Sequence, residues 1–161
     1  PAGVRENGGQ YTHGAVWLAM ACFRLERPAD GWAVLKALLP EGHPTEIYRG
    51  EPYVVAADVA HAPGRTGRAG WTWYTGAAGW YWQTAVQELL GLKITEGRLT
   101  VEPDLPPDWP GYEAVWRLPG GRLEICVERT GTWSAALDGG RVEGGVPLKG
   151  LTGGHRLEVT I

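Results

Sequence analysis

Hydrophobic positions in this chain follow two different periods, and the change falls near Gly91. Before that point, apolar residues recur every three or four positions, as they do on one face of a helix. Beyond it, they alternate with polar residues, as in strands that bury one face. The pattern predicts an α plus β protein whose helices and strands occupy separate segments. We place the domains at residues 1–91 and 92–161.

Two helices are expected near the start of the chain. The first begins at Thr12, which can serve as its N-cap, and ends before Pro28. Its expected buried stripe consists of Ala15, Leu18, Ala19, Cys22 and Leu25. The second begins at Asp30 as its cap and runs to about Leu39, where prolines and glycines stop it. Together they predict a helical hairpin.

Residues 41–70 are punctuated by proline and glycine and predict an irregular segment, with a short buried turn at 53–59. A third helix is expected from Tyr74 to Leu90, with Gly91 as its C-terminal cap. Its expected buried face consists of Ala78, Trp82, Ala85 and Leu89.

The tail predicts an antiparallel sheet that forms one half of a β-sandwich. Seven short alternating runs are separated by Gly-rich or Pro-Gly turns, at residues 92–95, 98–102, 112–118, 122–129, 133–137, 141–143 and 155–161. Residues 105–110, Leu-Pro-Pro-Asp-Trp-Pro, predict a rigid extended link between the early and late strands.

The stretch from Arg65 to Trp82 changes from a glycine-rich basic loop to an aromatic helix. The expected helix start near Thr75 and Gly76 offers free N–H groups and a partial positive charge, which suit an anion. Arg65 and Arg68 either contact a ligand or belong to a solvated loop. Flat aromatic rings suit the apolar face of a sugar, although most of the nine tryptophans are expected to fill the core. We hypothesise an anion beside a sugar.

Composition and charge exclude several classes of protein. With 161 residues and a net charge of −3, the chain is a globular protein and not a general nucleic-acid binder. The apolar run 15–23 is too short to span a bilayer. Cys22 and Cys126 lie in apolar runs and indicate buried thiols in a reducing compartment. A single disulfide between them is the alternative.

Metal, nucleotide and hydrolase signals are weak. The candidate ligands His13, His43, Glu46, Asp58 and His61 match no zinc spacing. The sequence has neither a Gly-x-Ser-x-Gly elbow nor a phosphate loop that ends in Gly-Lys. We therefore expect neither a metal nor a cofactor.

Two motifs resemble glycoside hydrolase family 94, the inverting phosphorylases of β-linked glucosides. They are Val4-Arg-Glu-Asn-Gly-Gly-Gln-Tyr-Thr-His-Gly-Ala-Val-Trp17 and Thr66-Gly-Arg-Ala-Gly-Trp-Thr-Trp-Tyr-Thr-Gly-Ala-Ala-Gly-Trp80. Within the family, the second motif is most similar to the C-terminal module of cyclic β-1,2-glucan synthases and to β-1,2-oligoglucan phosphorylases. The resemblance implies the last helices of a six-hairpin α/α barrel, followed by a β-sandwich. The chain would then be the C-terminal part of a longer polypeptide.

The resemblance also implies roles for individual residues. His13, the Thr75 hydroxyl and the Gly76 amide match the family's phosphate-binding groups. Glu6 matches an acidic residue near the acceptor sugar. Independently of the resemblance, Arg65 and Arg68 of the basic loop are candidate substrate-binding residues. The family's catalytic aspartate lies on an upstream motif, so no catalytic residue is assigned here, and neither Asp58 nor Asp104 is given that role.

The expected reaction is reversible phosphorolysis of a β-linked glucan, with β-1,2 linkage favoured, to α-glucose 1-phosphate. Inorganic phosphate is the co-substrate, and the 161 residues alone would be inactive. Expected partners are a β-glucan oligosaccharide, phosphate and the upstream barrel, with a homodimer left open. The expected location is the cytoplasm, or the inner membrane if the parent is a glucan synthase. The alternatives are a non-catalytic carbohydrate-binding module and a structural module of a synthase.

Overall fold

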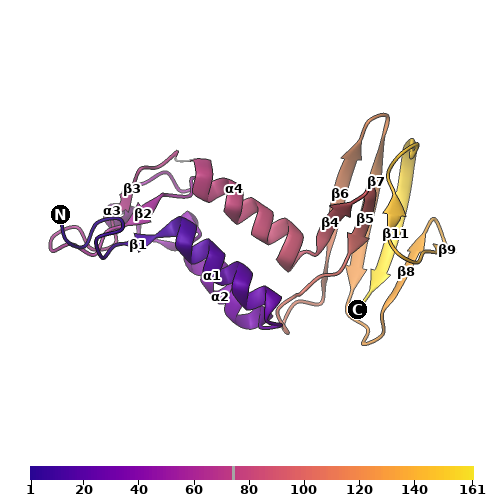
Figure 1. Ribbon diagram of the computed structural model, residues 1–161, viewed down its shortest axis with the longest axis horizontal. Coiled ribbons are helices and arrows are strands. Elements are labelled where there is room, and N and C mark those ends of the chain that lie inside the picture. The colour runs from indigo at the N-terminus through magenta and orange to yellow at the C-terminus, as the bar shows by residue number, and fades with distance from the viewer. Residues whose placement is uncertain (74) are drawn as a thin grey trace. The chain divides into compact units, whose positions relative to one another are not determined.

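The computed structural model describes residues 1–73 and 75–161, and residue 75 without its side chain. The chain forms two compact units, Pro1–Leu89 and Leu90–Ile161, hereafter unit 1 and unit 2. Unit 1 holds the long helices, and unit 2 consists of strands and loops (Figure 1). The α plus β character predicted from the sequence is confirmed, whereas the proposed domain roles stay predictions.

Unit 1 is built on three helices. Helix α1 spans Thr12–Arg24, α2 spans Pro28–Ala37, and α4 spans Thr75–Thr84. A π-helical turn at Ala85–Leu89, η2, continues α4. Two short turns, η1 at Pro40–Gly42 and α3 at Thr45–Tyr48, follow α2. The third helix therefore forms where expected, although its expected first residue, Tyr74, lies outside the described residues.

A small antiparallel sheet adjoins the helices of unit 1. Its strands are β1 (Gln10–Tyr11), β2 (Asp58–Val59) and β3 (Ala69–Gly70), in the order β1-β2-β3. The backbone N–H of Thr12, the first residue of α1, donates to the carbonyl of Ala57 at 2.9 Å. The start of α1 is thus tied to the segment that precedes β2.

Both predicted N-caps were wrong. The N-cap of α1 is Tyr11, and no side chain caps this helix. The Thr12 hydroxyl lies inside the first turn and donates to Oε1 of Gln10 at 3.4 Å. Helix α2 begins at Pro28, because the fixed φ of proline and its missing N–H suit the first helical position. Asp30 therefore lies in the first turn and pairs with Arg27 at 2.8 Å.

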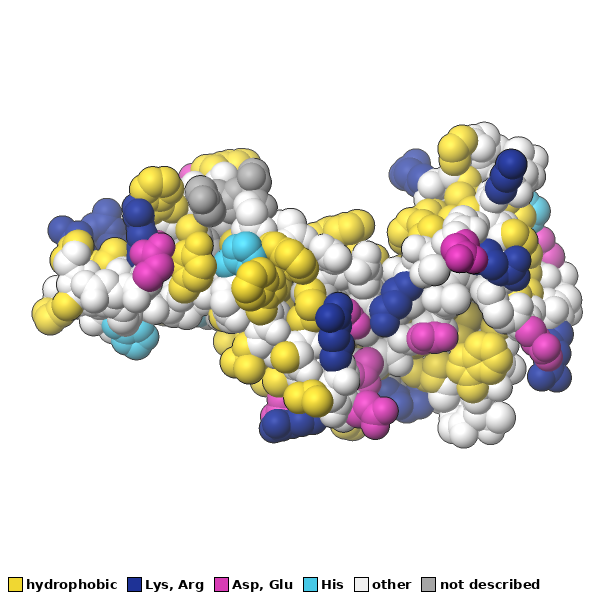
Figure 2. Space-filling model, viewed as in Figure 1, with side chains coloured by type: hydrophobic (Ala, Val, Ile, Leu, Met, Phe, Trp, Pro, Cys, Tyr) yellow, Lys and Arg dark blue, Asp and Glu magenta, His cyan; other side chains and the backbone are white. Residues whose placement is uncertain are grey.

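The predicted buried faces of α1 and α4 were right only in part. Ala19, Cys22 and Leu89 are buried, but Leu18 is 57% exposed and Leu25 is 68% exposed. Trp82 is 62% exposed, while the neighbouring row of α4 and η2 buries Thr84 and Glu88. An apolar pattern cannot select a row that contains a threonine and a glutamate. Hydrophobic side chains consequently appear on the surface of unit 1 in Figure 2.

Unit 2 contains two sheets. The first has the order β10-β5-β4, from β4 (Leu92–Thr95), β5 (Arg98–Val101) and β10 (Val146–Pro147). The second has the order β6-β7-β11-β8-β9. Its strands are β6 (Gly111–Leu118), β7 (Gly121–Glu128), β8 (Ser134–Leu137), β9 (Gly140–Arg141) and β11 (Gly153–Thr160). Each predicted run overlaps a strand, although 141–143 shares only Arg141 with β9, and β10 was not predicted.

The expectation of purely antiparallel pairing was wrong at one place, because β11 pairs with β7 in parallel over its full length. The other described strand pairs are antiparallel. Burial alternates along β7, where Leu123, Ile125 and Val127 point into the core, as the period of two predicted. Alternation identifies a buried face but does not identify the partner strand.

Among the residues that the structure describes, no helix has the length and apolar character needed to cross a bilayer. The two cysteines, buried Cys22 and partly buried Cys126, are free thiols. Burial, with the neighbouring carboxylate of Glu128 as a second cause, raises the pKa of Cys126. A thiol of raised pKa carries less thiolate at neutral pH than an ordinary cysteine does.

Candidate functional site

The predicted phosphate-binding residues lie at the starts of two helices, and we call His13, Thr75 and Gly76 the helix-start cluster. His13 is the second residue of α1, and Thr75 and Gly76 are the first two residues of α4. The first N–H groups of a helix have no partner within the helix, and the helix dipole places positive potential there. Gly76 is exposed, so its backbone is accessible.

The imidazole of His13 is held by aromatic rings. It meets the indole of Trp17 edge-on, with ring centroids 4.6 Å apart, and lies 5.8 Å from the ring of Trp80 in α4. Its Nε2 atom is buried and has no hydrogen-bond partner among the described residues. A buried ring nitrogen without a partner has lost hydration energy that no contact with the described residues replaces.

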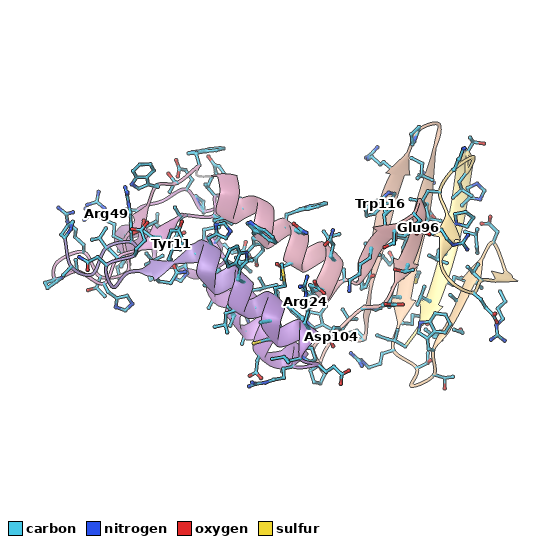
Figure 3. All side chains as sticks on the ribbon, viewed as in Figure 1. Tyr11, Arg24, Arg49, Glu96, Asp104 and Trp116 are labelled. Atoms are coloured by element: carbon cyan, nitrogen blue, oxygen red, sulfur yellow. The ribbon has the colours of Figure 1, made fainter. Side chains whose placement is uncertain are left out.

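Helices α1 and α4 run in the same direction, so their N-terminal ends lie together (Figure 1). His13 contacts Trp80 near one end of the pair, while Arg24 contacts Glu88 near the other. Figure 3 labels Tyr11 and Arg24 at opposite ends of α1. Gly76 precedes Trp80 by four residues and therefore lies on the same face of α4. The ring of His13 thus meets the face of α4 that carries Gly76.

The predicted substrate-binding residues Glu6, Arg65 and Arg68 line a single cavity of about 810 Å³ in unit 1. We call it the basic cavity. Its other walls come from the N-terminal segment, β2, β3 and the residue after β3: Pro1, Val4, Arg5, Asn7, Asp58, Ala60, Ala69, Gly70 and Trp71. The structure therefore brings together three residues that are far apart in the sequence. Their role in binding stays a prediction.

Positive charge dominates the basic cavity. Arg5, Arg65 and Arg68 supply three guanidinium groups, against the carboxylates of Glu6 and Asp58. The guanidinium carbon of Arg5 lies 3.9 Å from the ring centroid of Trp71, a cation–π contact. Basic side chains also gather over the end of unit 1 that carries the N-terminus in Figure 2.

Sequence reasoning missed Asp58 as a residue of the cavity. Its side chain is only 2% exposed, and Oδ2 accepts a hydrogen bond from the backbone N–H of Arg5 at 3.1 Å. A signal was present, because Asp58 interrupts the apolar run Val54-Val-Ala-Ala57 and Val59. A carboxylate that the pattern buries must have a polar partner.

The three-stranded sheet connects the helix-start cluster to the basic cavity. Across the strands, Tyr11 lies opposite Asp58, and Asp58 lies opposite Gly70. Tyr11 stacks with His13 at a centroid distance of 6.3 Å, and Trp71 directly follows Gly70. One row of paired residues therefore runs from the histidine to the cavity wall.

The remaining histidines do not join this site. His43 stacks on Tyr48 at 5.0 Å, and its Nε2 lies 3.1 Å from the carbonyl of Ala37. His61 is exposed. Within residues 1–73 and 75–161, no group of three or more His, Cys, Asp or Glu side chains converges to hold a metal.

Unit 2 holds a smaller apolar cavity of about 110 Å³, bordered by the half-exposed indole of Trp133. Ligand pockets usually enclose at least about 300 Å³. This cavity is therefore smaller than an ordinary ligand pocket.

Comparison with known proteins agrees with the two motifs. The family model described as "Glycosyl hydrolase 94 superfamily, catalytic domain" matches residues 1–91. A cyclic beta-(1,2)-glucan synthase of Rhizobium meliloti (strain 1021) is 46% identical over 134 residues, which is 80% of this chain and 5% of that protein.

Two phosphorylases are more distant relatives. An N,N'-diacetylchitobiose phosphorylase of Vibrio proteolyticus is 31% identical over 156 residues, covering 90% of this chain and 19% of the enzyme. A 3-O-beta-D-glucopyranosyl-beta-D-glucuronide phosphorylase of Paenibacillus borealis is 27% identical over 157 residues, covering 86% of this chain and 19% of that enzyme.

The chain spans 5 to 19% of the length of these relatives. Since the family model matches more than half of the chain and contains the helix-start cluster and the basic cavity, the assignment applies to the candidate site itself. The chain belongs to the glycosyl hydrolase 94 superfamily.

Proposed function

We propose that this chain is the C-terminal part of a carbohydrate phosphorylase that cleaves β-linked glucans with phosphate, and that its share of the active site is the phosphate-binding half. The observation that carries the proposal is the position of His13, with its buried and unpartnered Nε2, on the aromatic face that α1 and α4 share.

The helix-start cluster supplies donors suited to phosphate. The N–H of Gly76 lies in the first turn of α4, where the helix dipole favours an anion. The Nε2–H tautomer or the protonated form of His13 donates a hydrogen bond from the opposite helix. The Thr75 hydroxyl completes the set by resemblance to the family.

The basic cavity is proposed to receive the acceptor end of the glucan. Glu6 accepts hydrogen bonds from sugar hydroxyls, and the guanidinium groups of Arg65 and Arg68 donate to sugar oxygens. Glu6, Arg65 and Arg68 are all exposed at the cavity surface, so a sugar can reach them. A cavity of about 810 Å³ has room for more than one sugar ring.

In the proposed reaction, a phosphate oxygen forms a bond to the anomeric carbon while the glycosidic C–O bond breaks on the opposite face. The configuration at that carbon inverts, which converts a β-glucoside into α-glucose 1-phosphate. The leaving oxygen takes a proton from a carboxylic acid, and the proton of hydrogen phosphate restores the balance. That acid is proposed to lie outside this chain. Residues 1–161 contribute by holding the nucleophile in line.

We further propose that unit 1 is the end of an α/α barrel and that unit 2 is a β-sandwich cap. The exposed apolar side chains of Leu18 in α1 and of Leu25, which follows α1, support the first part, because they would pack against further helices of a barrel. The identity to a cyclic beta-(1,2)-glucan synthase supports β-1,2-glucans as the substrate class.

The test is performed on the full-length protein that contains this chain. It is incubated with β-1,2-gluco-oligosaccharides with and without inorganic phosphate, and α-glucose 1-phosphate is measured. The account expects phosphate-dependent release, and no release from residues 1–161 alone. Hydrolysis without phosphate, or no product from any β-linked glucan, contradicts the proposal. Glucan binding by residues 92–161 that ignores phosphate would instead favour a carbohydrate-binding module.

A further inference from the structure

We infer that Asp58 and Gly70 are positioning residues for the acceptor sugar, because together they fix the Arg5–Glu6 turn at the wall of the basic cavity. The inference rests on the proposed function, in which Glu6 contacts the acceptor. It assigns Asp58 neither acid nor nucleophile chemistry.

The first step is the anchor between Asp58 and the turn. Asp58 comes from β2, and its Oδ2 accepts the backbone N–H of Arg5 at 3.1 Å. Arg5 has a φ of 50°, in the left-handed region that a non-glycine residue adopts only at an energetic cost. The carboxylate offsets that cost with a charge-assisted hydrogen bond, which is the stronger kind.

The second step is the fit between Asp58 and Gly70. These residues are paired across β2 and β3, so their side-chain positions lie on the same face of the sheet. A Cβ atom added to Gly70 would lie 2.2 Å from Oδ1 of Asp58, which is far inside contact distance. Only glycine at position 70 therefore leaves room for the carboxylate in its observed position. The backbone of Gly70 does not need a left-handed φ, so space is the reason for glycine here.

The third step is the effect on Glu6. The backbone of Arg5 is held by Asp58, and its guanidinium stacks at 3.9 Å on Trp71, the residue after Gly70. The turn is also closed internally, because the N–H of Gly9 donates to the carbonyl of Arg5 at 2.9 Å. Glu6 follows Arg5 directly and is exposed in the cavity. Its carboxylate is thus aimed by contacts made by its neighbour.

The alternative is a purely structural role for the Asp58–Arg5 contact. The two roles differ in kinetics, because the reverse reaction has two substrates that use different parts of the site. Displacing Glu6 weakens binding of the acceptor sugar but leaves binding of glucose 1-phosphate at the helix-start cluster unchanged. A general loss of structure affects both substrates and the folded fraction alike.

The experiment measures glucan synthesis by the full-length protein from α-glucose 1-phosphate and a β-1,2-linked glucose disaccharide as acceptor. The variants are Asp58→Ala, Gly70→Ala, their double combination, and Asp58→Asn. The matched control is Gly79→Ala, because a Cβ at Gly79 in α4 meets no atom within 4 Å.

The expected result is a rise in the acceptor KM of about tenfold or more in Asp58→Ala, from loss of a hydrogen bond to a charged group. Gly70→Ala should give a similar rise, and the double variant no more than either one, since both changes displace the same contact. Asp58→Asn keeps an oxygen that can accept the Arg5 N–H, so it should restore most of the acceptor affinity. The KM for glucose 1-phosphate should stay within about twofold of the wild type in all four variants.

An unchanged acceptor KM in a folded Asp58→Ala variant overturns the inference, as does an equal rise in both KM values. If Asp58→Ala does not fold, the comparison of Gly70→Ala with Asp58→Asn decides by the same criteria. A wild-type protein that makes and consumes no glucose 1-phosphate overturns the proposed function as well. Failure of the inference alone leaves the wild-type reaction intact, so the two outcomes are distinguishable.

Discussion

The imidazole of His13 lies 5.8 Å from the indole of Trp80, which places the start of α1 against the first turns of α4. The two residues come from the two motifs that carry the family resemblance. Their contact brings two segments that are distant in sequence together at the proposed phosphate-binding site. The predictions below follow from this packing and from the contacts that support it.

The buried carboxylate of Glu88 should make Arg24 important for stability. Glu88 is 8% exposed and accepts hydrogen bonds from Nε and Nη2 of Arg24 at 3.0 and 2.9 Å. Arg24→Ala removes these donors and should lower the free energy of unfolding by about 1–3 kcal/mol. Arg27→Ala is the matched control, since Arg27 and Asp30 are both more than half exposed. It should cost less than about 1 kcal/mol. Urea denaturation compares the two, and equal losses would show that burial of Glu88 is irrelevant.

Gly91 should be the least replaceable glycine at the start of unit 2. Its φ is +66°, and an added Cβ would lie 2.1 Å from the backbone carbonyl of Glu102. Gly97 also has a left-handed φ, +74°, but a Cβ there meets open space. Gly97→Ala should therefore lower the free energy of unfolding by only about 1–2 kcal/mol, the strain of a left-handed backbone at a residue with a Cβ. Gly91→Ala should cost about 1–3 kcal/mol more, because of the overlap. Thermal unfolding of both variants measures the difference, and similar melting temperatures would contradict it.

The pair formed by His155 and Asp138 should make stability depend on pH. Nδ1 of His155 lies 2.7 Å from Oδ2 of Asp138, and Nε2 lies 2.9 Å from the carbonyl of Thr152. Both ring nitrogens face acceptors, so the imidazolium suits this site. The hydrogen bond to Asp138 and that to Thr152 raise the pKa of His155, and the bond from His155 lowers the pKa of Asp138.

The sign of the pH effect follows from these two directions. A raised histidine pKa stabilises the fold fully below the ordinary value of about 6.5 and loses this effect as the pH rises through the folded value. A lowered aspartate pKa stabilises above its ordinary value and loses this effect as the pH falls through the folded value. His155→Gln should therefore lower the melting temperature more at pH 5.5 than at pH 8.5, and Asp138→Asn should behave alike. If the difference in melting temperature between variant and wild type is the same at both pH values, the pairing is contradicted.

Local pattern was sufficient for some parts of the fold and insufficient for others. The alternation at residues 122–129 predicted a strand with one buried face, because the period of a strand is set by its own backbone. Leu123, Ile125 and Val127 of β7 form that face. The parallel partner β11 could not be predicted, since it joins β7 only after β8, β9 and β10 intervene. Pairing between distant strands depends on the packing of the whole unit.

The candidate site was likewise predictable from the sequence only in part. The sequence singled out Glu6 by its motif and Arg65 and Arg68 by their basic loop, and the structure places all three at one cavity. The place of Asp58 at the cavity was not predicted, because its partner, the N–H of Arg5, is distant in sequence and is a backbone group. Likewise, Glu88 was assigned no role because the apolar pattern of α4 favoured the face of Trp82, which is 62% exposed. Contacts of a buried polar group with a distant residue leave no periodic trace in the sequence.

The most direct test of the account is the phosphate dependence of phosphorolysis by the full-length protein, wild type beside His13→Ala. His61→Ala is the matched control, because its imidazole is exposed and lines no part of the basic cavity. The account predicts that kcat/KM for phosphate falls about a hundredfold or more in His13→Ala, as on loss of one donor to a reacting anion, and stays near wild type in His61→Ala. Saturation of His13→Ala by phosphate with wild-type constants would contradict the account.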